Sequence, residues 1–467
     1  MPLVAGVDSS TSACKIEVRD ADTGALVATG RAPHPPTTPP RSEQDPAAWD
    51  SAFDTAGAQA GIVGRHAPAA ISIAAQQHGL VVLDSGGAVL RPAKLWNDTE
   101  SAPDAAELVD QLGPYAWARA CGSVPVASFT VTKLRWLRRI EPDVFAQVAA
   151  VLLPHDWLTW RLTGRRTTDR GDASGTGYWS PAEGRYRFDL LGLVDDTVAW
   201  EALLPEVLGP NEIAGEWAGH DALVAPGTGD NMAAAIGVGA SPSDLVLSLG
   251  TSGTAFTVSD SPTADPAGTV AGFADATGRY LPLVCTLNAT KVTETFGRFL
   301  SADHDRFDHL ALEAEPGAGG VVVVPHFDGE RTPNRPDASG TLSGLRAETT
   351  SAQLARAAVE GVVCNILAGA EALPRCDGRV LLIGGGARSR AYRQVVADLT
   401  GRSVIAVTSE ELVARGAAIQ AAAVLHGVTC DEVASAWSLE RGATVEPTAG
   451  VDAMAIREAY AAAVARP

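Results

Sequence analysis

The sequence predicts an α/β protein built from two lobes. Its 467 residues are too many for one compact core, because single cores stop growing at about 250–300 residues. Length alone favours about three domains and also allows two large ones. Short apolar strands alternate with helical patterns in both halves of the chain, which favours two α/β lobes. We place the boundary between 235 and 245, so that 1–240 forms an N-terminal lobe and 241–467 a C-terminal lobe.

A strand, a turn of small residues and a second strand occur once in each half. In residues 4–18, Asp8 ends an apolar run and a Ser-Ser-Thr turn follows. In residues 245–258, the turn is the small-residue stretch 250–253. Both segments have the pattern of a β-hairpin. Two such turns facing one another between two lobes would present backbone N–H groups to one anion, which suggests an enzyme that binds the phosphates of a nucleotide.

The first half of the chain begins with this hairpin and a proline-rich loop. An Asp-Pro pair then opens a helix, because proline at the first helical position after an acidic residue is a start signal. The elements expected next are a helix from Asp45-Pro46 to about Gly64, strands at 69–75 and 80–85 separated by a turn at 76–79, and a helical segment at 151–164 that stops at Gly164.

The second half repeats the alternation of strands and helices. The expected elements are a strand at 222–227, a small-residue helix at 230–240, a strand at 245–250, a buried strand at 321–327, one long helix at 350–373, a strand at 379–383 that enters a glycine turn, a helix from about Tyr392 and a final helix at 411–427.

Composition excludes several classes of function. The formal net charge is −19, so the chain has no basic surface to neutralise a nucleic-acid backbone. The six cysteines show neither a C-x-x-C pair nor zinc-ligand spacing, which favours reduced thiols. The N-terminus lacks a signal-peptide pattern, and no apolar run reaches membrane-spanning length. We therefore expect a soluble cytoplasmic protein without nucleic-acid or membrane partners.

Two aspartates are candidates for phosphoryl-transfer chemistry. Asp8 ends a buried strand before a small-residue turn, where a carboxylate can hold hydrated Mg²⁺ against phosphates. An Asx-turn would explain Asp8 better in isolation, but Lys15 and the second hairpin favour the metal. Asp230 precedes a helix of small residues, where it is a helix N-cap, a general base that accepts a hydroxyl proton, or both. The small residues around Asp230 would let a ligand come close.

Three further segments carry weaker signals. The glycines at 384–386 follow an apolar strand and let the backbone approach a flat or anionic ligand, although glycine is also common there for packing. The chain contains neither a Rossmann G-x-G-x-x-G nor a Walker A motif. His78 stands in a Gln-His-Gly turn and, taken alone, is best explained as a turn histidine. The tripeptide 96–98, Trp-Asn-Asp, suits a polyol, and a surface turn explains it nearly as well.

These segments, in this order, resemble the FGGY family of carbohydrate kinases over nearly the whole chain. GVDSSTSACK at 6–15 is similar to the first phosphate loop of that family. The other matching strings are SEQDP, QQHG, LWND, LLPHDWLTWRLTG, DASGTGYW, GTGDNMAAAIGVG, LSLGTSG, GGGARS and ARGAAIQAA. The resemblance implies two actin-like lobes of the ribonuclease H-like type. The sugar would lie deep in a cleft between them, with ATP mostly on the C-terminal lobe.

The resemblance also implies a role for each matching residue. Asp230 would be the catalytic base, and Asp8 the carboxylate on the Mg²⁺ side. The residues around the sugar would be Gln77, His78, Gly79, Trp96, Asp230 and Asn231. The residues around the nucleotide would be Thr11, Gly250, Thr251, Ser252, Gly253, Gly384, Gly385, Gly386 and Ala387.

The implied substrates are ATP and a ketopentose, D-xylulose before others, with D-xylulose 5-phosphate as the product. Glycerol is disfavoured, because glycerol kinases of the family usually carry an Arg-Glu pair where this chain has His78-Gly79. Ribulose, another pentulose, a polyol or gluconate stays open as the substrate. An actin-like ATPase or a sugar-responsive binding protein without kinase activity is the alternative from another class. A homodimer is compatible with these expectations.

One position departs from the family pattern. The glycine of the first phosphate loop is replaced by Ser10. If that position needs a positive φ, serine costs about 1 kcal/mol relative to glycine. The roles implied for Asp8 and Thr11 are therefore better supported than any backbone contact at Ser10.

Overall fold

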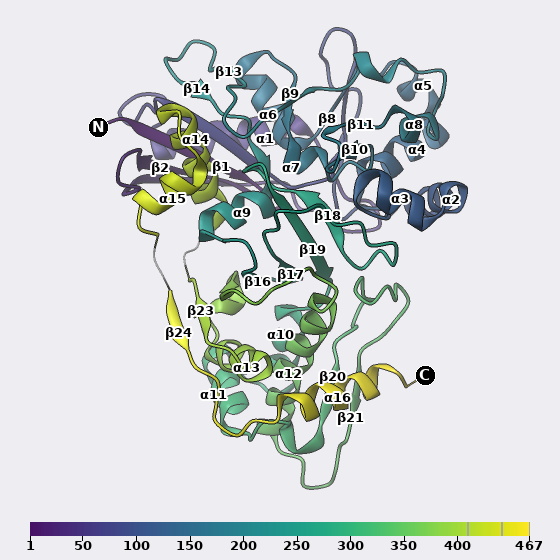
Figure 1. The fold of residues 1–467 in the computed structure, drawn as a ribbon, viewed down its shortest axis with the longest axis vertical. Coiled ribbons are helices and arrows are strands. Elements are labelled where there is room, and N and C mark those ends of the chain that lie inside the picture. Colours follow the sequence, from purple (N-terminus) through teal and green to yellow (C-terminus); the bar gives the residue numbers. More distant parts are fainter. Residues whose placement is uncertain (409–410, 440–441, 467) are drawn as a thin grey trace. The chain divides into compact units, whose positions relative to one another are not determined.

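The computed structural model describes residues 1–408, 411–439 and 442–466 (Figure 1). The chain forms two compact units, and both are discontinuous in the sequence. The first comprises Met1–Ala240, Ser259–Leu281 and Glu411–Leu439, and the second comprises Ser241–Val258, Pro282–Glu410 and Glu440–Pro467. Both units contain β-strands and helices, which confirms the α/β class with two sheet-containing lobes. The assignment of 1–240 to the sugar and of 241–467 to ATP stays a prediction.

The first unit is built on a sheet with strand order β13-β14-β5-β1-β2-β3, in which β15 also pairs with β5. Its strands are β1 (Leu3–Ser9), β2 (Ala13–Asp20), β3 (Leu26–Pro33), β5 (Ala70–Ala75), β13 (Gly215–Glu216), β14 (Leu223–Val224) and β15 (Thr228–Gly229). β1 and β2 form the predicted first hairpin, and their antiparallel register sets Asp8 opposite Lys15. β1 runs parallel to β5, so both strands end at the same edge of the sheet.

The carboxyl end of β5 brings together segments that lie far apart in the sequence. β15 pairs in parallel with the last residues of β5, with Gly229 opposite Ala75. The turn 76–79 follows Ala75, and helix α9 (Asp230–Val238) begins directly after Gly229. The pairing of β5 with a two-residue strand therefore places Asp230 beside the Gln-Gln-His-Gly turn.

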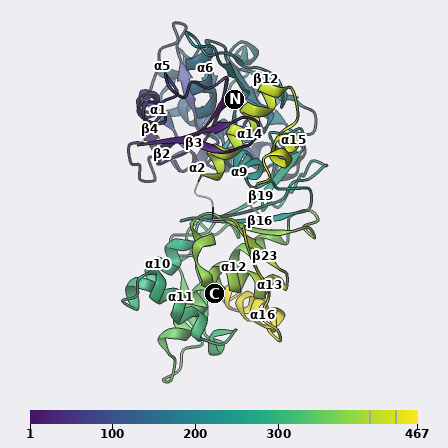
Figure 2. The same ribbon diagram turned by 90° about the vertical axis from the view of Figure 1, so that its left-hand side faces the viewer.

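Helix α14 (Leu412–His426) returns from the C-terminal part of the chain and packs on β1, β5 and α9 (Figures 1 and 2). The contact is close, because a Cβ on Gly6 would lie 1.9 Å from the carbonyl oxygen of Ala414. Only glycine fits there. The prediction that this is the final helix is wrong, since α15 (Cys430–Ala436) and α16 (Ala453–Val464) follow. Both begin at a side-chain N-cap rather than at the start of a clear apolar pattern.

Two predicted helices of this unit differ from the structure. α1 (Pro46–Ala60) begins after its N-cap Asp45 as expected, but it ends at the left-handed Gly61 rather than near Gly64. The segment 151–164 is not helical throughout, because strand β8 (Ala150–Leu152) precedes α6 (Pro154–Thr163). Proline is the cause, since it pushes the residue before it into an extended conformation.

Smaller elements complete the first unit. β6 (Val81–Leu83) pairs with β8 and not with β5, so the turn 76–79 connects two different sheets. The remaining elements are β4 (Glu43–Gln44), β7 (Ala93–Lys94), α2 (Ala102–Leu112), α3 (Pro114–Cys121), α4 (Thr130–Ile140), α5 (Pro142–Phe145), β9 (Thr167–Asp169), α7 (Arg170–Ala173), β10 (Trp179–Ser180), β11 (Arg185–Tyr186), α8 (Phe188–Gly192), β12 (Glu206–Leu208) and β18 (Ala271–Ala274).

The second unit is built on a sheet in which the strands follow the order β19-β17-β16-β22-β23-β24. These strands are β16 (Leu245–Leu249), β17 (Gly253–Phe256), β19 (Tyr280–Thr286), β22 (Val380–Ile383), β23 (Val404–Ala406) and β24 (Ala443–Val445). β16 and β17 form the predicted second hairpin. β16 runs parallel to β22, so the loops 250–253 and 384–387 follow strands that end at the same edge of the sheet.

The helices of the second unit agree largely with the predicted pattern. α12 (Ser351–Ala370) is the expected long helix, and α13 (Arg390–Thr400) begins two residues before Tyr392. The other α-helices are α10 (Thr290–Phe299), α11 (His304–Glu313) and α16 near the C-terminus. The apolar run 321–327 gives only the short strand β20 (Val322–Val324), which pairs with β21 (Thr341–Ser343) in a separate two-stranded sheet.

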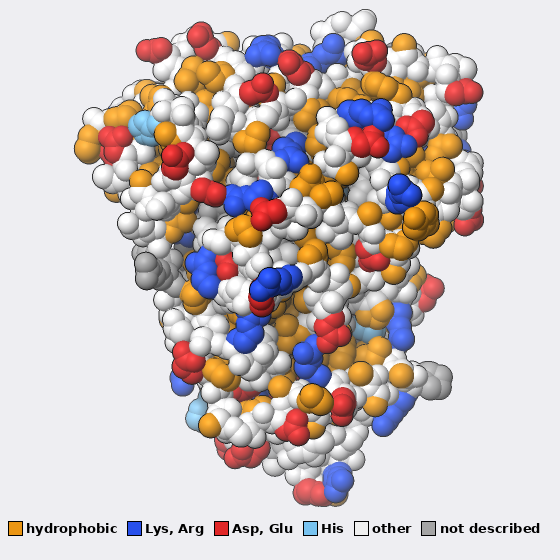
Figure 3. Space-filling view, in the orientation of Figure 1, with side chains coloured by type: hydrophobic (Ala, Val, Ile, Leu, Met, Phe, Trp, Pro, Cys, Tyr) orange, Lys and Arg blue, Asp and Glu red, His pale blue; other side chains and the backbone are white. Residues whose placement is uncertain are grey.

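The surface carries both signs of charge. Acidic and basic side chains are interspersed over the face drawn in Figure 3. Among the described residues, no single helix is long and apolar enough to cross a membrane, while the bent pair α14 and α15 meets that test by length and composition only. Most residues of α14 are buried, as expected of a core helix.

Candidate active site

Asp8 lies at the end of β1 in a network of charged and polar side chains. Its Oδ1 accepts hydrogen bonds from the backbone N–H of Ser10 at 3.0 Å and from the Ser10 hydroxyl. Its Oδ2 lies 3.2 Å from Lys15 Nζ, which is also 2.9 Å from Glu411 Oε2. Burial works against the charge of Lys15, but the two carboxylates raise its pKa above the usual value. Asp8 thus makes both the Asx-turn contact and an ion pair with a charged lysine.

The first loop accommodates serine without backbone strain. Ser10 is not among the residues with positive φ, and its side chain bonds Asp8 instead. The hydroxyl of Thr11 accepts the indole N–H of Trp96 at 2.8 Å and donates to Gln76 Oε1 at 3.3 Å. Both contacts engage the Thr11 hydroxyl within the protein, and the predicted approach of Thr11 to the phosphates stays a prediction.

Asp230 is the first residue of α9, and the N-cap of that helix is Gly229. The N-cap explanation of Asp230 is therefore wrong. Its Oδ1 accepts the backbone N–H of Asn231 at 2.8 Å and the Asn231 Nδ2 at 3.0 Å. Burial, followed by the charges of Asp8 and Asp172, raises the pKa of Asp230 to about 7. A carboxylate with such a pKa is suited to accept a proton near neutral pH.

Gln77 is linked to this carboxylate through the amide of Asn231. The Nδ2 of Asn231 donates to Gln77 Oε1 at 3.0 Å. The approach depends on a glycine, because a Cβ on Gly229 would lie 2.6 Å from Gln77 Cγ. Gln77 Nε2 is buried and has no hydrogen-bond partner within the described residues. A buried donor of this kind can be satisfied by a hydroxyl of a ligand.

His78 is held in the left-handed conformation, with φ 66°. Its Nδ1 lies 2.6 Å from the carbonyl oxygen of Gly175, and its own carbonyl accepts the Thr130 hydroxyl at 3.2 Å. The ring stacks on Phe129 with 4.9 Å between centroids. The contact of Nδ1 with Gly175 and the stacking on Phe129 fix the orientation of the imidazole.

Gly79 has a structural explanation of its own. A Cβ at this position would lie 2.5 Å from Pro154 Cγ, at the start of α6. Glycine is therefore required for packing against that helix. Its predicted role beside the sugar is not needed to explain it.

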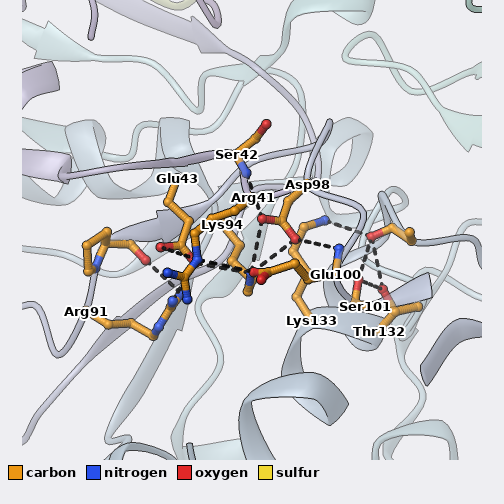
Figure 4. Close-up of polar contacts among 12 residues, drawn as sticks. Arg41, Ser42, Glu43, Arg91, Lys94, Asp98, Glu100, Ser101, Thr132 and Lys133 are labelled. Carbon is orange, nitrogen blue, oxygen red and sulfur yellow. Dashed lines mark hydrogen bonds and ion pairs between the residues drawn. The ribbon is translucent and has the colours of Figure 1, made fainter. Parts of the chain in front are cut away.

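Trp96 lies in the sequence between Lys94 and Asp98, which belong to one ion cluster (Figure 4). Lys94 Nζ lies 3.0 Å from Asp98 Oδ2, 2.6 Å from Glu100 Oε2 and 3.1 Å from Glu43 Oε1. Lys94 and Asp98 flank Trp96 in the sequence and are both fully buried, so this segment is not a simple surface turn. The three carboxylates are the one group with metal-ligand spacing among the described residues, and Lys94 already neutralises part of their charge.

The predicted nucleotide loops of the second unit differ in how open they are. Gly253 is buried, and a Cβ there would lie 2.7 Å from Thr286 Oγ1. Neither Gly250 nor Gly253 has a positive φ. Packing against Thr286, and not turn geometry, therefore explains the glycine at 253. Gly250 and Ser252 are partly exposed and Thr251 is exposed, so a phosphate group can reach these three residues.

The glycine turn after β22 packs closely on the end of β16. A Cβ on Gly384 would lie 2.8 Å from the carbonyl oxygen of Leu249, and one on Gly386 would lie 2.7 Å from Leu249 Cβ. Gly384 also has φ 80°, which favours glycine. Gly385 is exposed and has open space where a Cβ would stand, whereas Ala387 is fully buried. A flat ligand can therefore reach Gly384 and Gly385 more easily than the other two.

A buried histidine among three aspartates is missing from the sequence prediction. His155 Nδ1 lies 2.7 Å from Asp172 Oδ2, and its Nε2 lies 3.2 Å from Asp156 Oδ1. Asp169 completes the group and accepts the N–H groups that open α7. A signal was present, because His155 and Asp172 lie in two strings that match the family without a role attached to either residue. Their proximity depends on tertiary packing, since α6 and α7 are separate elements.

Asp8 fits a hydrated cation better than a cage of protein ligands. Within the part of the chain that the structure describes, no group of three residues with ligand spacing includes Asp8. Mg²⁺ usually keeps several waters and is held by one or two carboxylates plus substrate phosphates. An ionised carboxylate has about four acceptor sites, so Asp8 can accept hydrogen bonds from metal-bound water in addition to its contacts with Ser10 and Lys15.

Known proteins are similar to this chain in sequence and in fold. Residues 3–237 match the N-terminal domain and residues 245–425 the C-terminal domain of the FGGY family of carbohydrate kinases. Xylulose kinase from Streptomyces coelicolor is 48% identical over 457 residues, which cover 95% of this chain and 92% of that protein. Xylulose kinase from Escherichia coli is 34% identical over 85% of both chains.

Solved structures agree with these matches. The crystal structure of xylulose kinase from Bifidobacterium adolescentis has a TM-score of 0.87 and 42% identity, and covers 99% of both chains. The crystal structure of Plasmodium falciparum glycerol kinase with ADP has a TM-score of 0.88 at 17% identity, covering 99% of this chain and 98% of that one. The second likeness shows a shared fold alone.

Proposed function

Because this chain belongs to the FGGY family of carbohydrate kinases and is a carbohydrate kinase, we propose that it transfers the γ-phosphoryl group of ATP to a ketopentose. D-xylulose is the proposed substrate and D-xylulose 5-phosphate the product. The observation that carries the proposal is the group of polar side chains at the end of β5, where Asp230, Asn231, Gln77 and His78 converge. The similarity to proteins named xylulose kinase supports the choice of sugar.

The polar groups around Asp230 suit a polyhydroxylated molecule. Gln77 Nε2 is a buried donor without a partner in the described residues. Sugar hydroxyls accept hydrogen bonds, so one of them would satisfy this donor. The indole of Trp96 would offer an apolar face to the carbon chain. Its N–H is already bonded to Thr11, which sets the orientation of the ring.

The proposed reaction is an in-line displacement at phosphorus. The terminal hydroxyl oxygen of the sugar forms a bond to the γ-phosphorus, while the bond from that phosphorus to the β–γ bridging oxygen breaks. ADP leaves with the electron pair of the broken bond, and the hydroxyl proton passes to a carboxylate oxygen of Asp230. With its pKa at about 7, Asp230 is partly ionised at neutral pH and holds the transferred proton well. Positioning of the hydroxyl supplies much of the acceleration.

The nucleotide is proposed to bind to the two loops of the second unit. Backbone N–H groups of 250–252 would approach the phosphates, and the open surface at Gly384 and Gly385 would lie against the nucleoside. Mg²⁺, held through water by Asp8 and by the phosphates, would neutralise charge on the transferred group when bound.

Coupled measurement of ADP release over a panel of sugars tests the proposal. The panel contains D-xylulose, D-ribulose, L-ribulose, glycerol and gluconate, each with Mg²⁺ and ATP. We expect the highest kcat/KM for D-xylulose, with phosphate located on the terminal carbon by ³¹P NMR. A higher kcat/KM for another sugar of the panel would change the proposed substrate but not the proposed reaction. ATP hydrolysis that no sugar stimulates would instead support the actin-like ATPase.

A further inference from the structure

His155 is enclosed in the interior of the first unit by three carboxyl groups. His155, Asp156 and Asp172 are fully buried, and Asp169 is 2% exposed. The Nδ1 of His155 lies 2.7 Å from Asp172 Oδ2, and its Nε2 lies 3.2 Å from Asp156 Oδ1 and 3.9 Å from Asp169 Oδ1. A Cβ on Gly227 would lie 2.7 Å from His155 Cδ2. The imidazole therefore packs directly against the backbone that leads into β15.

These carboxylates favour the protonated ring. Burial alone would lower the pKa of His155, but Asp156, Asp172 and Asp169 outweigh it and raise the pKa to about 9. Burial raises the pKa of Asp156 to about 7 and that of Asp169 to about 6. An ionised carboxylate in a protein interior is costly unless a positive charge or hydrogen bonds accompany it. An imidazolium at this position would supply that charge.

One side of this group holds His78. The residue whose carboxylate meets His155 also shapes the turn beside His78, because the backbone carbonyl of Asp172 accepts the N–H of Gly175 at 2.9 Å. The same turn offers the Gly175 carbonyl to His78 Nδ1 at 2.6 Å. A histidine with φ 66° is in a conformation that costs free energy unless its surroundings hold it there. The Gly175 carbonyl, which the backbone of Asp172 helps to place, contributes to that hold.

The other side of the group holds the strand before Asp230. Asp169 Oδ2 accepts the Thr228 hydroxyl at 2.7 Å. Thr228 and Gly229 form β15, and α9 begins with Asp230 immediately after it. Asp169 also accepts the N–H groups of Gly171 at 2.9 Å and Asp172 at 2.8 Å, so it ties β15 to the turn that contacts His78. The contacts through Asp172 and the contacts through Asp169 thus form two arms, and both arms meet at the imidazole of His155.

We propose that His155, as a buried imidazolium, is a positioning residue that fixes the sugar-contacting His78 and the base Asp230 at the same time. The inference rests on the proposed function of those two residues. His155 touches neither the sugar nor ATP in this arrangement. It acts by keeping Asp172 and Asp169 charged and in place, so that each holds one of the two site residues.

The first experiment reads the charge of His155 without any substrate. ¹⁵N NMR of the full-length protein at pH 7, with the signal assigned by its loss in His155→Gln, should show both ring nitrogens protonated. A neutral ring at pH 7 would overturn the proposal. This measurement does not depend on kinase activity. Its result can therefore contradict this inference without contradicting the proposed function, and the reverse also holds.

The second experiment measures kinetics of His155→Gln beside the wild type. We expect kcat to fall and the KM for D-xylulose to rise, each on the order of tenfold or more, because small displacements of reacting groups are costly. The KM for ATP should stay within about twofold, since the nucleotide loops belong to the other unit. His155→Lys, which retains a positive charge, should recover part of the loss. A folded His155→Gln with wild-type constants for the sugar would contradict the proposal.

A matched pair of threonine variants tests the contacts through Asp169 alone. The pair remains informative if the His155 variants do not fold. Thr228→Val removes the hydroxyl that bonds Asp169 and should lower kcat several-fold with a smaller change in thermal stability. Thr167→Val makes the same substitution at a threonine that is 1% exposed and whose hydroxyl has no hydrogen-bond partner within the described residues. It should leave kcat unchanged. Equal losses of kcat in the two variants would refute the positioning role.

Discussion

Asp8 and Lys15 face each other across the β1–β2 ladder, and Lys15 Nζ lies 3.2 Å from Asp8 Oδ2. The hairpin register alone sets this pair, because antiparallel strands joined by a short turn place the two residues opposite one another. Glu411, at the start of α14, adds a second carboxylate 2.9 Å from the same Nζ. The first loop therefore combines one cation with two carboxylates, of which only Asp8 ends the strand that leads into the loop.

Asp8→Asn removes a negative charge and keeps the shape of the side chain. If Asp8 holds hydrated Mg²⁺, this variant should need more Mg²⁺ for half-maximal velocity while the KM for D-xylulose changes little. A titration of initial velocity with Mg²⁺ at fixed ATP measures the effect. Lys15 loses one of its two partners in the variant, so thermal unfolding should be recorded alongside. An unchanged Mg²⁺ requirement in a stable Asp8→Asn protein would rule out the metal role.

Asp230→Asn tests the general base. The amide cannot accept the hydroxyl proton, and general-base catalysis contributes about 10²–10⁴-fold, so kcat should fall by that factor. Binding of D-xylulose, measured by calorimetry, should remain near the wild-type level, because the contacts to Asn231 and Gln77 are largely kept. Asp303→Asn, which alters the exposed N-cap of α11, is the control and should turn over normally. Near-normal turnover of Asp230→Asn would exclude the base assignment.

The activity should depend on pH through Asp230. Its pKa is raised from an ordinary value near 3.8 to about 7. In the proposed role as base, the ionised form is the active one. The kcat/KM should therefore increase with pH up to about 7 and level off above it. The linked stability has the opposite sign, because the folded state binds this proton more tightly. That contribution is present below pH 4 and is lost as the pH rises towards 7. A pH–rate profile that is flat across neutrality would contradict the assignment.

Lys94→Met tests the ion cluster beside Trp96. The substitution leaves Glu43, Asp98 and Glu100 close together without the buried cation, and removing one partner of a buried ion pair costs about 3–5 kcal/mol. Chemical unfolding should report a loss of that order. Lys291→Met removes the partner of Asp328 in an exposed ion pair and should cost less than about 1 kcal/mol. Similar losses in both variants would mean that the cluster of Figure 4 contributes no more than a surface pair.

Two glycines of the turn after β22 should respond differently to alanine. Gly385 has open space for a Cβ, so Gly385→Ala should fold normally and raise the KM for ATP by narrowing the predicted nucleoside surface. Gly386→Ala would place its Cβ 2.7 Å from Leu249 Cβ and should lower the melting temperature. Steady-state kinetics and thermal unfolding of both variants distinguish the two roles. A normal ATP KM in Gly385→Ala would remove this loop from the nucleotide site.

Much of the fold follows from local patterns. The two hairpins, the Asp-Pro start of α1, the long helix α12 and the glycine turn after β22 are all encoded within short stretches. Sequence patterns also mislead where an adjacent residue sets the conformation. Pro154 holds the residue before it in an extended conformation and so divides one apolar pattern into a strand and a helix. The glycines show the same limit. Gly79 and Gly253 suggest ligand contacts in the sequence, whereas in the structure each gives room to a packed side chain.

By itself, the sequence determined the α/β class, the hairpin that opposes Asp8 to Lys15, and a family resemblance from which Asp230 is proposed as the base. These features depend on residues that are close in the chain or on ordered motifs. Only the tertiary structure decided that Asp230 shares Asn231 with Gln77, which of the predicted glycines are open, and that His155 lies buried among three aspartates. The reason is physical: strand pairing between β5 and β15, and the contact of His155 on α6 with Asp172 on α7, join segments that no local pattern relates.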